Sequence, residues 1–82
     1  MTPTEVIEVV GTLVDRWCDR HALAPLRHIV RAYPLISGLT DEWAELLVAL
    51  ENIRAFCRDE LPPREEDEVE RCISAIQRLV YR

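Results

Sequence analysis

The stretch TDEWAELLVALENIRAFC, residues 40–57, decides the fold, because its apolar residues recur at the spacing of an α-helix. With about 100° of rotation per residue, they span an arc of about 180°. This arc holds Trp43, Leu46, Leu47, Ala49, Leu50, Ile53, Phe56 and Cys57. Thr40 is a natural N-cap, and Asp41 and Glu42 suit the positive end of the helix dipole. So wide a stripe predicts a central helix over about 41–59 that contacts more than one neighbour.

The N-terminal segment is predicted to form a helix over about residues 3–20. Thr2 and Glu5 have the spacing of a capping box, and a proline occupies the first helical position. The apolar residues of this segment fall in an arc of about 140°. They are Val6, Ile7, Val10, Leu13, Val14, Trp17 and Cys18. The opposite side is charged, so we expect one face of this helix to lie against the core.

Prolines mark the limits of two further helices. Pro25 can open a helix, and Pro34 disfavours helical geometry in the residue before it, which predicts a helix over about 25–33. Its apolar face is expected to hold Leu26, Ile29, Val30 and Tyr33. Pro63 opens a last helix over about 63–81. Its apolar stripe consists of Val69, Cys72, Ile73, Ile76, Leu79 and Val80.

These four amphipathic segments, joined by short connections, predict an all-α protein. No segment shows the alternation of a strand, so we expect a small antiparallel four-helix bundle that forms a single domain over residues 1–82. Acids crowd the first turns of the last helix, where they match its dipole. Acid pairs such as Glu65 and Glu68 are interpreted as solvated helix ends rather than as a general acid and base.

The composition favours a globular protein that does not bind nucleic acid. Of the 82 residues, 49% are apolar and 30% are charged, with a formal net charge of −5 at pH 7. Phosphate binding needs a cationic surface, so nucleic acid is not an expected partner. The N-terminal residues MTPTEVIEVV have no basic region, and Glu5 and Glu8 interrupt their apolar run. Neither a secretory signal nor a membrane span is therefore expected.

The cysteines and the basic residues indicate a compartment and an origin. Cys18, Cys57 and Cys72 are odd in number and widely spaced. A reduced cytoplasmic protein is the simplest interpretation. All ten basic residues are arginine and none is lysine, which fits a GC-rich bacterial genome. We therefore expect a bacterial cytoplasmic protein.

Few residues occur in patterns that carry chemistry. Cys18 and His21 have a spacing that can hold a metal, but zinc needs three or four protein ligands and no second pair completes the set. Ser37 and Ser74 lie in no nucleophile motif, and the two glycines are isolated. We expect no catalytic residues, no metal and no cofactor, and therefore no enzyme activity.

The residues that could bind a partner lie near the second helix and the connection that follows it. Arg27, His28 and Arg31 form a cationic face, interpreted either as solvated or as a docking patch for an acidic partner. The segment RAYPLISGLTDEW, residues 31–43, is either a recognition loop or only a joint between helices. The candidate partner-binding residues are Arg27, His28, Arg31, Tyr33, Trp43 and Val48.

These observations favour a non-enzymatic protein that acts through protein–protein contacts. An immunity-type or antitoxin-type protein, or a regulatory adaptor, would suit its size, acidity and helicity, although fold-level analogy is a weak warrant. One alternative is a bundle that binds a small ligand or a metal through Cys18, His21 and the Tyr33–Trp43 joint. Another is a self-associating structural subunit, because Val48 lies on the polar side of its helix and suggests a homodimer contact.

Overall fold

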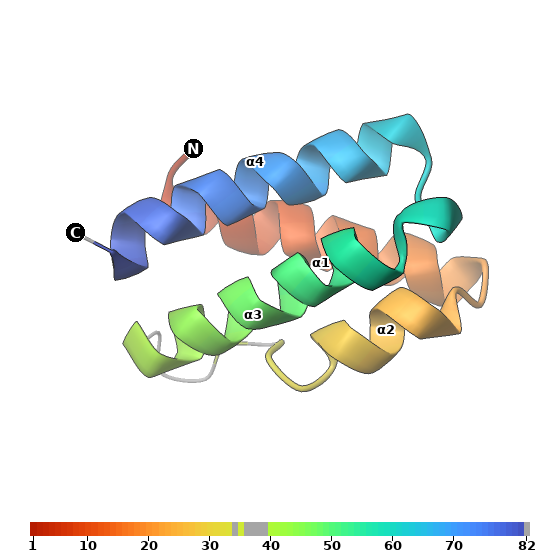
Figure 1. The fold of residues 1–82 in the computed structure, drawn as a ribbon, viewed down its shortest axis with the longest axis horizontal. Helices are drawn as coiled ribbons and strands as arrows, with labels where there is room; N and C mark the ends of the chain where they lie inside the picture. Colours follow the sequence, from red (N-terminus) through yellow and green to blue (C-terminus); the bar gives the residue numbers. More distant parts are fainter. Residues whose placement is uncertain (34, 36–39, 82) are drawn as a thin grey trace.

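The computed structural model describes residues 1–33, 35 and 40–81, which form four α-helices and one turn of 3-10 helix. The elements are α1 (Pro3–Asp19), α2 (Leu23–Ile29), α3 (Thr40–Phe56), η1 (Arg58–Glu60) and α4 (Pro63–Val80) (Figure 1). None of these described residues lies in a strand. The predicted all-α four-helix bundle is confirmed.

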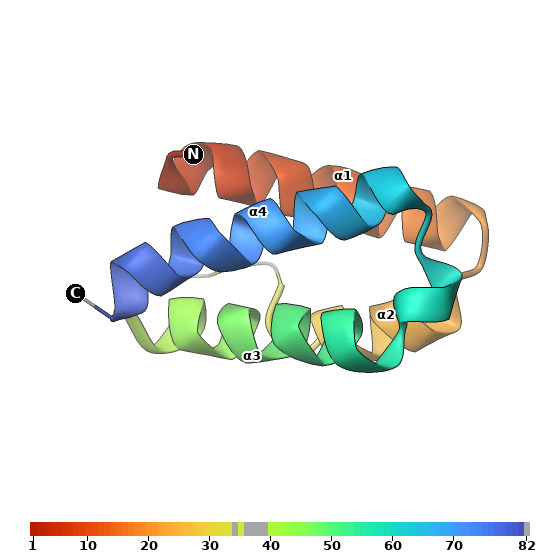
Figure 2. The same cartoon turned by 45° about the horizontal axis from the view of Figure 1, so that its top comes forward.

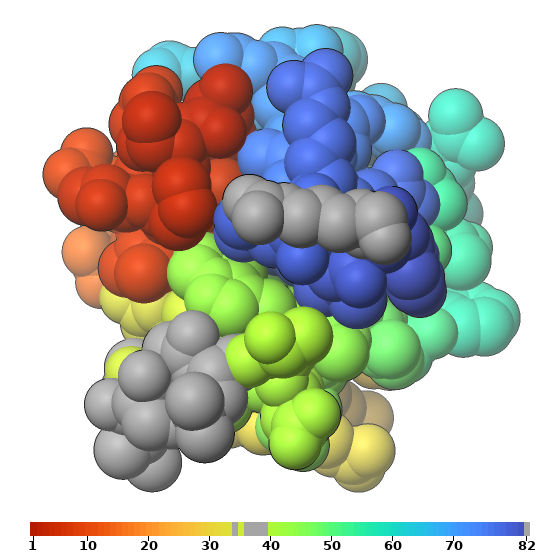
Figure 3. All heavy atoms as spheres, turned by 90° about the vertical axis from the view of Figure 1, so that its left-hand side faces the viewer, coloured from red at the N-terminus to blue at the C-terminus, as the bar shows by residue number. Residues whose placement is uncertain are grey.

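Each helix runs antiparallel to the neighbours against which it packs (Figures 1 and 2). The packed pairs are α1 with α2, α2 with α3, α3 with α4, and α4 with α1. This closed ring confirms that α3 contacts more than one neighbour. Seen from the end that carries the start of α1 and the end of α4, side chains fill the space between the helices (Figure 3).

The apolar stripes meet in one core. Its largest fully buried side chains are Trp17, Leu13, Ile29, Leu46, Leu47, Leu50, Ile53, Ile73, Ile76, Val6, Val10 and Val69. All of them belong to the stripes that helical periodicity predicts. The capping box is present as well, since the Thr2 hydroxyl accepts from the N–H of Glu5 at 3.2 Å and the Glu5 carboxylate accepts from that of Thr2 at 3.3 Å.

Three residues of the stripes predicted for α1 and α3 are exposed. Ile7 is 38% exposed and Cys18 is also exposed. Both lie at one edge of the apolar arc of α1, and the helix buries the other side. Phe56 is 76% exposed and lies at the edge of the arc of α3 that faces α2. An arc wider than the contact area leaves its edge residues in solvent.

The second helix spans Leu23–Ile29 instead of the predicted 25–33. Pro25 is its third residue, which is allowed because the N–H groups of a first turn have no partner within the helix. Beyond Ile29 the chain continues in turns, and the N–H of Tyr33 donates to the Ile29 carbonyl at 3.0 Å. Val30, placed on the apolar face by sequence, keeps helical geometry with φ −62° and ψ −21°. It is 63% exposed because it lies at the edge of the apolar arc.

The third helix also ends earlier than predicted, at Phe56 rather than near 59. The chain then tightens into η1, where the N–H of Leu61 donates to the Arg58 carbonyl at 3.3 Å. The tighter winding of a 3-10 turn carries Leu61 back onto the core, where only 6% of it remains exposed. Pro63 then begins α4 as the sequence predicts.

The end of α1 is a Schellman motif with a histidine in the place that glycine usually takes. The N–H of Ala22 donates to the Trp17 carbonyl at 2.8 Å, and the N–H of His21 donates to the Cys18 carbonyl at 3.2 Å. His21 has a φ of 56°, which residues with a Cβ adopt only at a cost. Ala22 is buried and is also the N-cap of α2. One tight turn therefore ends α1 and begins α2.

Gly11 lies where α1 passes the ring of Tyr33. A methyl group on Gly11 would lie 2.9 Å from the Tyr33 hydroxyl oxygen and 3.8 Å from the ring carbon that bears it. The first distance is too short and the second is ordinary van der Waals contact. A side chain at this point of the helix is therefore disfavoured by the phenol hydroxyl, because Tyr33 would have to shift to admit it.

We predict that His21→Gly stabilises the protein by about 1 kcal/mol, because glycine adopts the left-handed conformation without the penalty of a Cβ. The free energy of unfolding is measured by urea denaturation followed by circular dichroism. Asp15→Gly is the matched control, since this exposed residue lies inside α1, and it should destabilise the protein by about 0.5–1 kcal/mol. Equal effects of the two substitutions would contradict the role of His21.

A second prediction concerns Gly11 and Tyr33. Gly11→Ala should destabilise the wild-type protein through its clash with the hydroxyl. In a Tyr33→Phe background the same substitution should stabilise by about 0.5–1 kcal/mol, because alanine is the better helix former. A double-mutant cycle in urea measures this change of sign. An effect of Gly11→Ala that is the same in both backgrounds would contradict the proposed contact.

Candidate functional site

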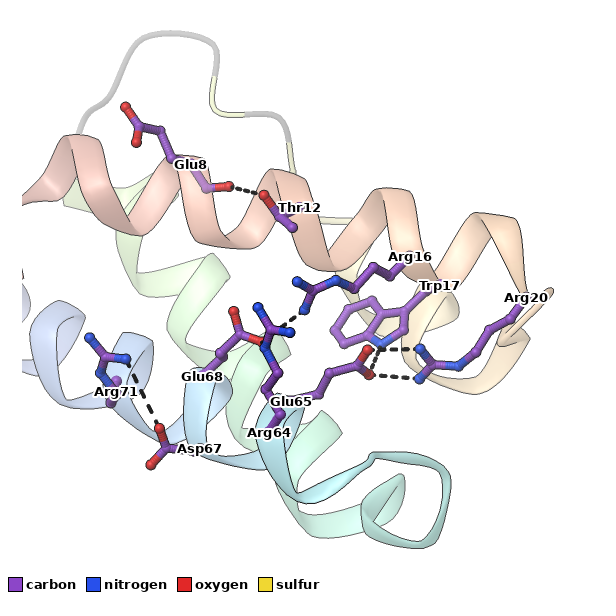
Figure 4. A network of polar contacts seen from close by, with 10 residues as sticks. All are labelled: Glu8, Thr12, Arg16, Trp17, Arg20, Arg64, Glu65, Asp67, Glu68 and Arg71. Atoms are coloured by element: carbon purple, nitrogen blue, oxygen red, sulfur yellow. Dashed lines mark hydrogen bonds and ion pairs between the residues drawn. The ribbon is translucent and has the colours of Figure 1, made fainter.

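The first candidate site is a buried carboxylate at the start of α4. Glu65 is 4% exposed, and its Oε1 accepts from Trp17 Nε1 at 2.9 Å. Arg20 binds both of its oxygens, with Nη1 donating to Oε2 at 2.8 Å and Nη2 donating to Oε1 at 2.6 Å (Figure 4). Arg20 Nη2 also donates to the Glu60 carbonyl at 3.2 Å.

The electrostatics of this network keep the carboxylate charged. The guanidinium of Arg20 lowers the pKa of Glu65, burial raises it, and the hydrogen bond from Trp17 lowers it further, with a net lowering. The pKa of Arg20 is raised, chiefly by its hydrogen bonds to Glu65. An acid or base poised near neutral pH needs the opposite shift. The network therefore joins α1, η1 and α4, and it does not supply proton-transfer chemistry.

This finding corrects the interpretation of Glu65 as part of a solvated helix end. The sequence contained a signal that was missed, because Trp17 lies in the middle of the α1 stripe. A buried indole N–H needs an acceptor, and a carboxylate in the first turn of another helix can supply one. Glu68 is closer to the prediction, since it is half-buried and pairs with Arg16 at 2.9 Å.

The other acids of α4 are largely taken up by ion pairs. Glu66 binds Arg58 at 3.0 Å, Glu70 binds Arg54 at 3.3 Å, and Asp67 lies 4.0 Å from Arg71. The dense acidic run that begins α4 is thus matched by arginines of neighbouring segments and of α4 itself. It serves the fold, and it leaves less uncompensated negative charge on this side than the sequence suggests.

The cysteines offer no activated nucleophile. Burial raises the pKa of Cys72 to about 11 and also raises that of Cys57, so both thiols are protonated at neutral pH. Cys18 is exposed, and His21 lies beyond the end of α1. Within the described residues, no group of three or more His, Cys, Asp or Glu side chains is arranged to hold a metal ion.

A groove between α2 and α3 is the largest hollow found among the described residues, with a volume of about 480 Å³. One wall and part of the floor come from α2 and the turn after it, and the other wall comes from α3. The lining residues are His28, Arg31, Ala32, Ala44, Glu45, Val48, Ala49 and Asn52. Two other hollows, beside α4, are smaller, at about 320 and 180 Å³.

Apolar side chains lie exposed along this groove. Val48 is 55% exposed on the outward face of α3. Further along the same helix, the exposed ring of Phe56 stacks on His28 with a centroid distance of 6.4 Å and an interplanar angle of 22°. Ala44 and Ala55 lie on the same outward side as Val48, among the charged residues Asp41 and Glu45. The outward side of α3 is therefore mixed, with apolar residues between charged ones.

The charges of the groove make no ion pairs among the described residues. Neither Arg27 nor Arg31 makes an ion pair with a residue whose position is described, and the same holds for Glu45 on the opposite wall. Most other arginines do make such pairs. They are Arg16, Arg20, Arg54, Arg58, Arg64 and Arg71.

The structure brings some of the predicted partner-binding residues together and separates others. His28, Arg31 and Val48 line the groove, and Arg27 lies exposed on α2 beside it. Trp43 is instead 8% exposed and belongs to the core, and Tyr33 is half-buried with its hydroxyl close to α1. The prediction of a recognition loop or joint over Pro34 and residues 36–38 falls on residues outside those described.

Sequence reasoning missed Glu45 and Asn52, which line the groove, and Phe56, which stacks on the lining residue His28. A signal was present on α3, because apolar residues also occur on the side opposite its main stripe. Only Val48 was predicted from that pattern. Phe56 was assigned to the core, since its angle falls at the edge of the apolar arc.

Comparisons with known proteins give no relative: no family model, no curated protein and no solved structure matches this chain. Across the described parts of the chain, no helix combines the length and apolar character needed to cross a membrane.

We predict that Glu65→Gln destabilises the protein by about 2–3 kcal/mol at pH 7, because the charge that Arg20 and Trp17 bind is removed. Since the pKa of Glu65 is lowered in the folded state, its contribution is complete above the usual pKa and is lost as the pH falls through the folded value. The difference from wild type should therefore shrink below about pH 4. Urea denaturation from pH 7 to pH 2 measures it.

Glu70→Gln is the matched control for this experiment. The pair of Glu70 with Arg54 is exposed on both sides, at 53% and 41%, so its loss should cost under about 0.5 kcal/mol. Similar losses for the two variants at pH 7 would show that the buried network is no more important than a surface pair.

Proposed function

We propose that this protein acts without catalysis, as a protein-interaction module whose contact surface is the groove between α2 and α3. The single observation that carries the proposal is the outward face of α3, where Val48 and Phe56 are 55% and 76% exposed. Single exposed apolar residues are common on any surface. Here they flank a groove whose charges make no ion pairs among the described residues, and both features favour a polypeptide ligand.

The shape and chemistry of the groove support binding of a helix or a helical face. Two antiparallel helices with small residues between them, Ala32, Ala44 and Ala49, form a shallow apolar track. Amphipathic helices bind in such grooves through residues spaced three or four positions apart. Arg31 and Glu45 at the two walls would orient the ligand, as polar groups do at the rim of an interface.

Among the titratable groups described above, none has the environment of a catalytic residue. Both oxygens of Glu65 are occupied, and the buried thiols are held protonated. The alternative of a small-ligand or metal site at Cys18 and His21 gains no support from their positions, one exposed at the end of α1 and the other in a turn. These points favour binding of a protein over a reaction or a metal.

The finer parts of the proposal are a bacterial origin, a cytoplasmic location, and a role as an adaptor or as an immunity-type or antitoxin-type protein. Free cysteines support a reducing compartment. The basic residues are all arginine, which supports a bacterial origin. The small helical fold and its exposed face are compatible with either role, and the partner identifies which one applies.

We predict that Val48→Asp reduces capture of the binding partner at least tenfold while leaving the fold intact, because a carboxylate cannot enter the apolar track without loss of hydration. Tagged wild-type protein and the variant are compared as baits in the source organism, with quantitative mass spectrometry of the captured proteins. Tyr81→Asp is the matched control, because Tyr81 is 71% exposed but lies at the end of α4.

Equal capture by the wild type and by Val48→Asp would remove the groove as the contact surface. Native mass spectrometry of the purified protein provides an independent check. A stoichiometric bound metal or small molecule would favour the ligand-binding alternative over the proposed one.

A further inference from the structure

We infer that the face formed by α2 and α3 packs against a second copy of this chain, related to the first by a twofold axis parallel to the groove. The inference rests on the proposed function of the groove as a contact surface and identifies the partner. Its basis is the arrangement of charge and apolar surface on this face.

The two walls of the groove carry opposite charges. Arg31 lies on the side of α2, with Arg27 nearby, and Glu45 lies on the side of α3. Arg31 and Glu45 both line the groove, and none of the ion pairs among the described residues joins them. Each charge therefore remains available to an opposite charge outside the chain.

Symmetry decides how a second copy would meet these walls. A twofold axis parallel to the helices places α2 of each copy over α3 of the other and preserves position along the groove. Arg31 of each copy then lies opposite Glu45 of the other, which makes two equivalent ion pairs. A twofold axis across the helices would instead place α2 on α2, with Arg27 and Arg31 opposite like charges, and such contacts are unfavourable.

The apolar part of the face is equally self-complementary. Val48 and the small residues Ala44 and Ala55 allow the outward sides of the two copies to approach closely, and Phe56 supplies an aromatic anchor beside His28. At 1.5 Å per residue, α3 is about 25 Å long and α2 with the turn after it is about 15 Å long, and each is about 10 Å wide, giving on the order of 400 Å² per copy. A dimer would bury about 800 Å², which is below the standard size of a specific interface, so we expect a weak, transient dimer with a dissociation constant on the order of 100 µM.

The experiment is sedimentation velocity of the purified full chain over the concentration range from about ten times below to ten times above the expected constant. The wild type should shift from monomer to dimer across this range. Arg31→Glu and Glu45→Arg should each weaken association at least tenfold, because each places two like-charged pairs in the dimer. An equimolar mixture of these two variants should restore association, since both ion pairs are then re-formed in the heterodimer.

Two variants control for net charge. Arg78→Glu makes the same change as Arg31→Glu at an exposed site on α4 that lies outside the groove and makes no ion pair in the described structure. Glu8→Arg makes the same change of charge as Glu45→Arg, but on the exposed side of α1. Both controls should associate like the wild type, and recovery in the mixture shows that the groove variants are folded.

A wild type that stays monomeric at the highest concentration would overturn the inference, as would a dimer that all four variants leave unchanged. If the Val48→Asp bait captures less of a protein of another sequence than the wild-type bait does, the groove is a contact surface for that protein. In that case only the identity of the partner is wrong. If capture is also unaffected by Val48→Asp, the proposed function fails as well.

Discussion

The indole N–H of Trp17 lies in the centre of the bundle, where it requires an acceptor that water cannot provide. Glu65 supplies that acceptor, and its buried charge in turn requires the guanidinium of Arg20, which also binds the Glu60 carbonyl. Apolar side chains of similar volume can be as stabilising as a buried ion pair, but they are not directional. The network therefore fixes how the end of α1, η1 and the start of α4 meet (Figure 4). Because α1 turns into α2 two residues after Arg20, the same corner also positions α2 against α3.

The charge of the chain is distributed by this architecture in a way that the net value of −5 does not reveal. Arginines of α1 and of the end of α3 are drawn to the acids of α4, at Glu65, Glu68 and Glu70. Arg27 and Arg31 make no ion pair with any described residue. The side that holds α4 is thus largely neutralised by its own ion pairs, whereas the charges at the groove are exposed to solvent.

Helical periodicity predicted the fold because α1, α3 and α4 each continue for four or more turns, long enough for the apolar stripe to define a face. It failed at the edges of the stripes, where Val30 and Phe56 lie beyond the contact with neighbouring helices and remain exposed. Glu65 was misread for another reason: its burial depends on a hydrogen bond from Trp17, 48 positions away in the sequence. Of the eight residues that line the groove, the three that the sequence predicted are His28, Arg31 and Val48.

The opposite charges of the groove walls also limit which partners it can accept. Any ligand must place an acidic group over Arg31, a basic group over Glu45 and apolar surface over Val48. A second copy meets these conditions by symmetry, whereas a protein of another sequence must reproduce the pattern. Under the proposed pairing, such a protein would compete with the dimer for one surface, so its apparent affinity would fall as the concentration of this chain rises. Self-association would then control access to the groove. The groove would be open at low concentrations of the chain and covered at high concentrations.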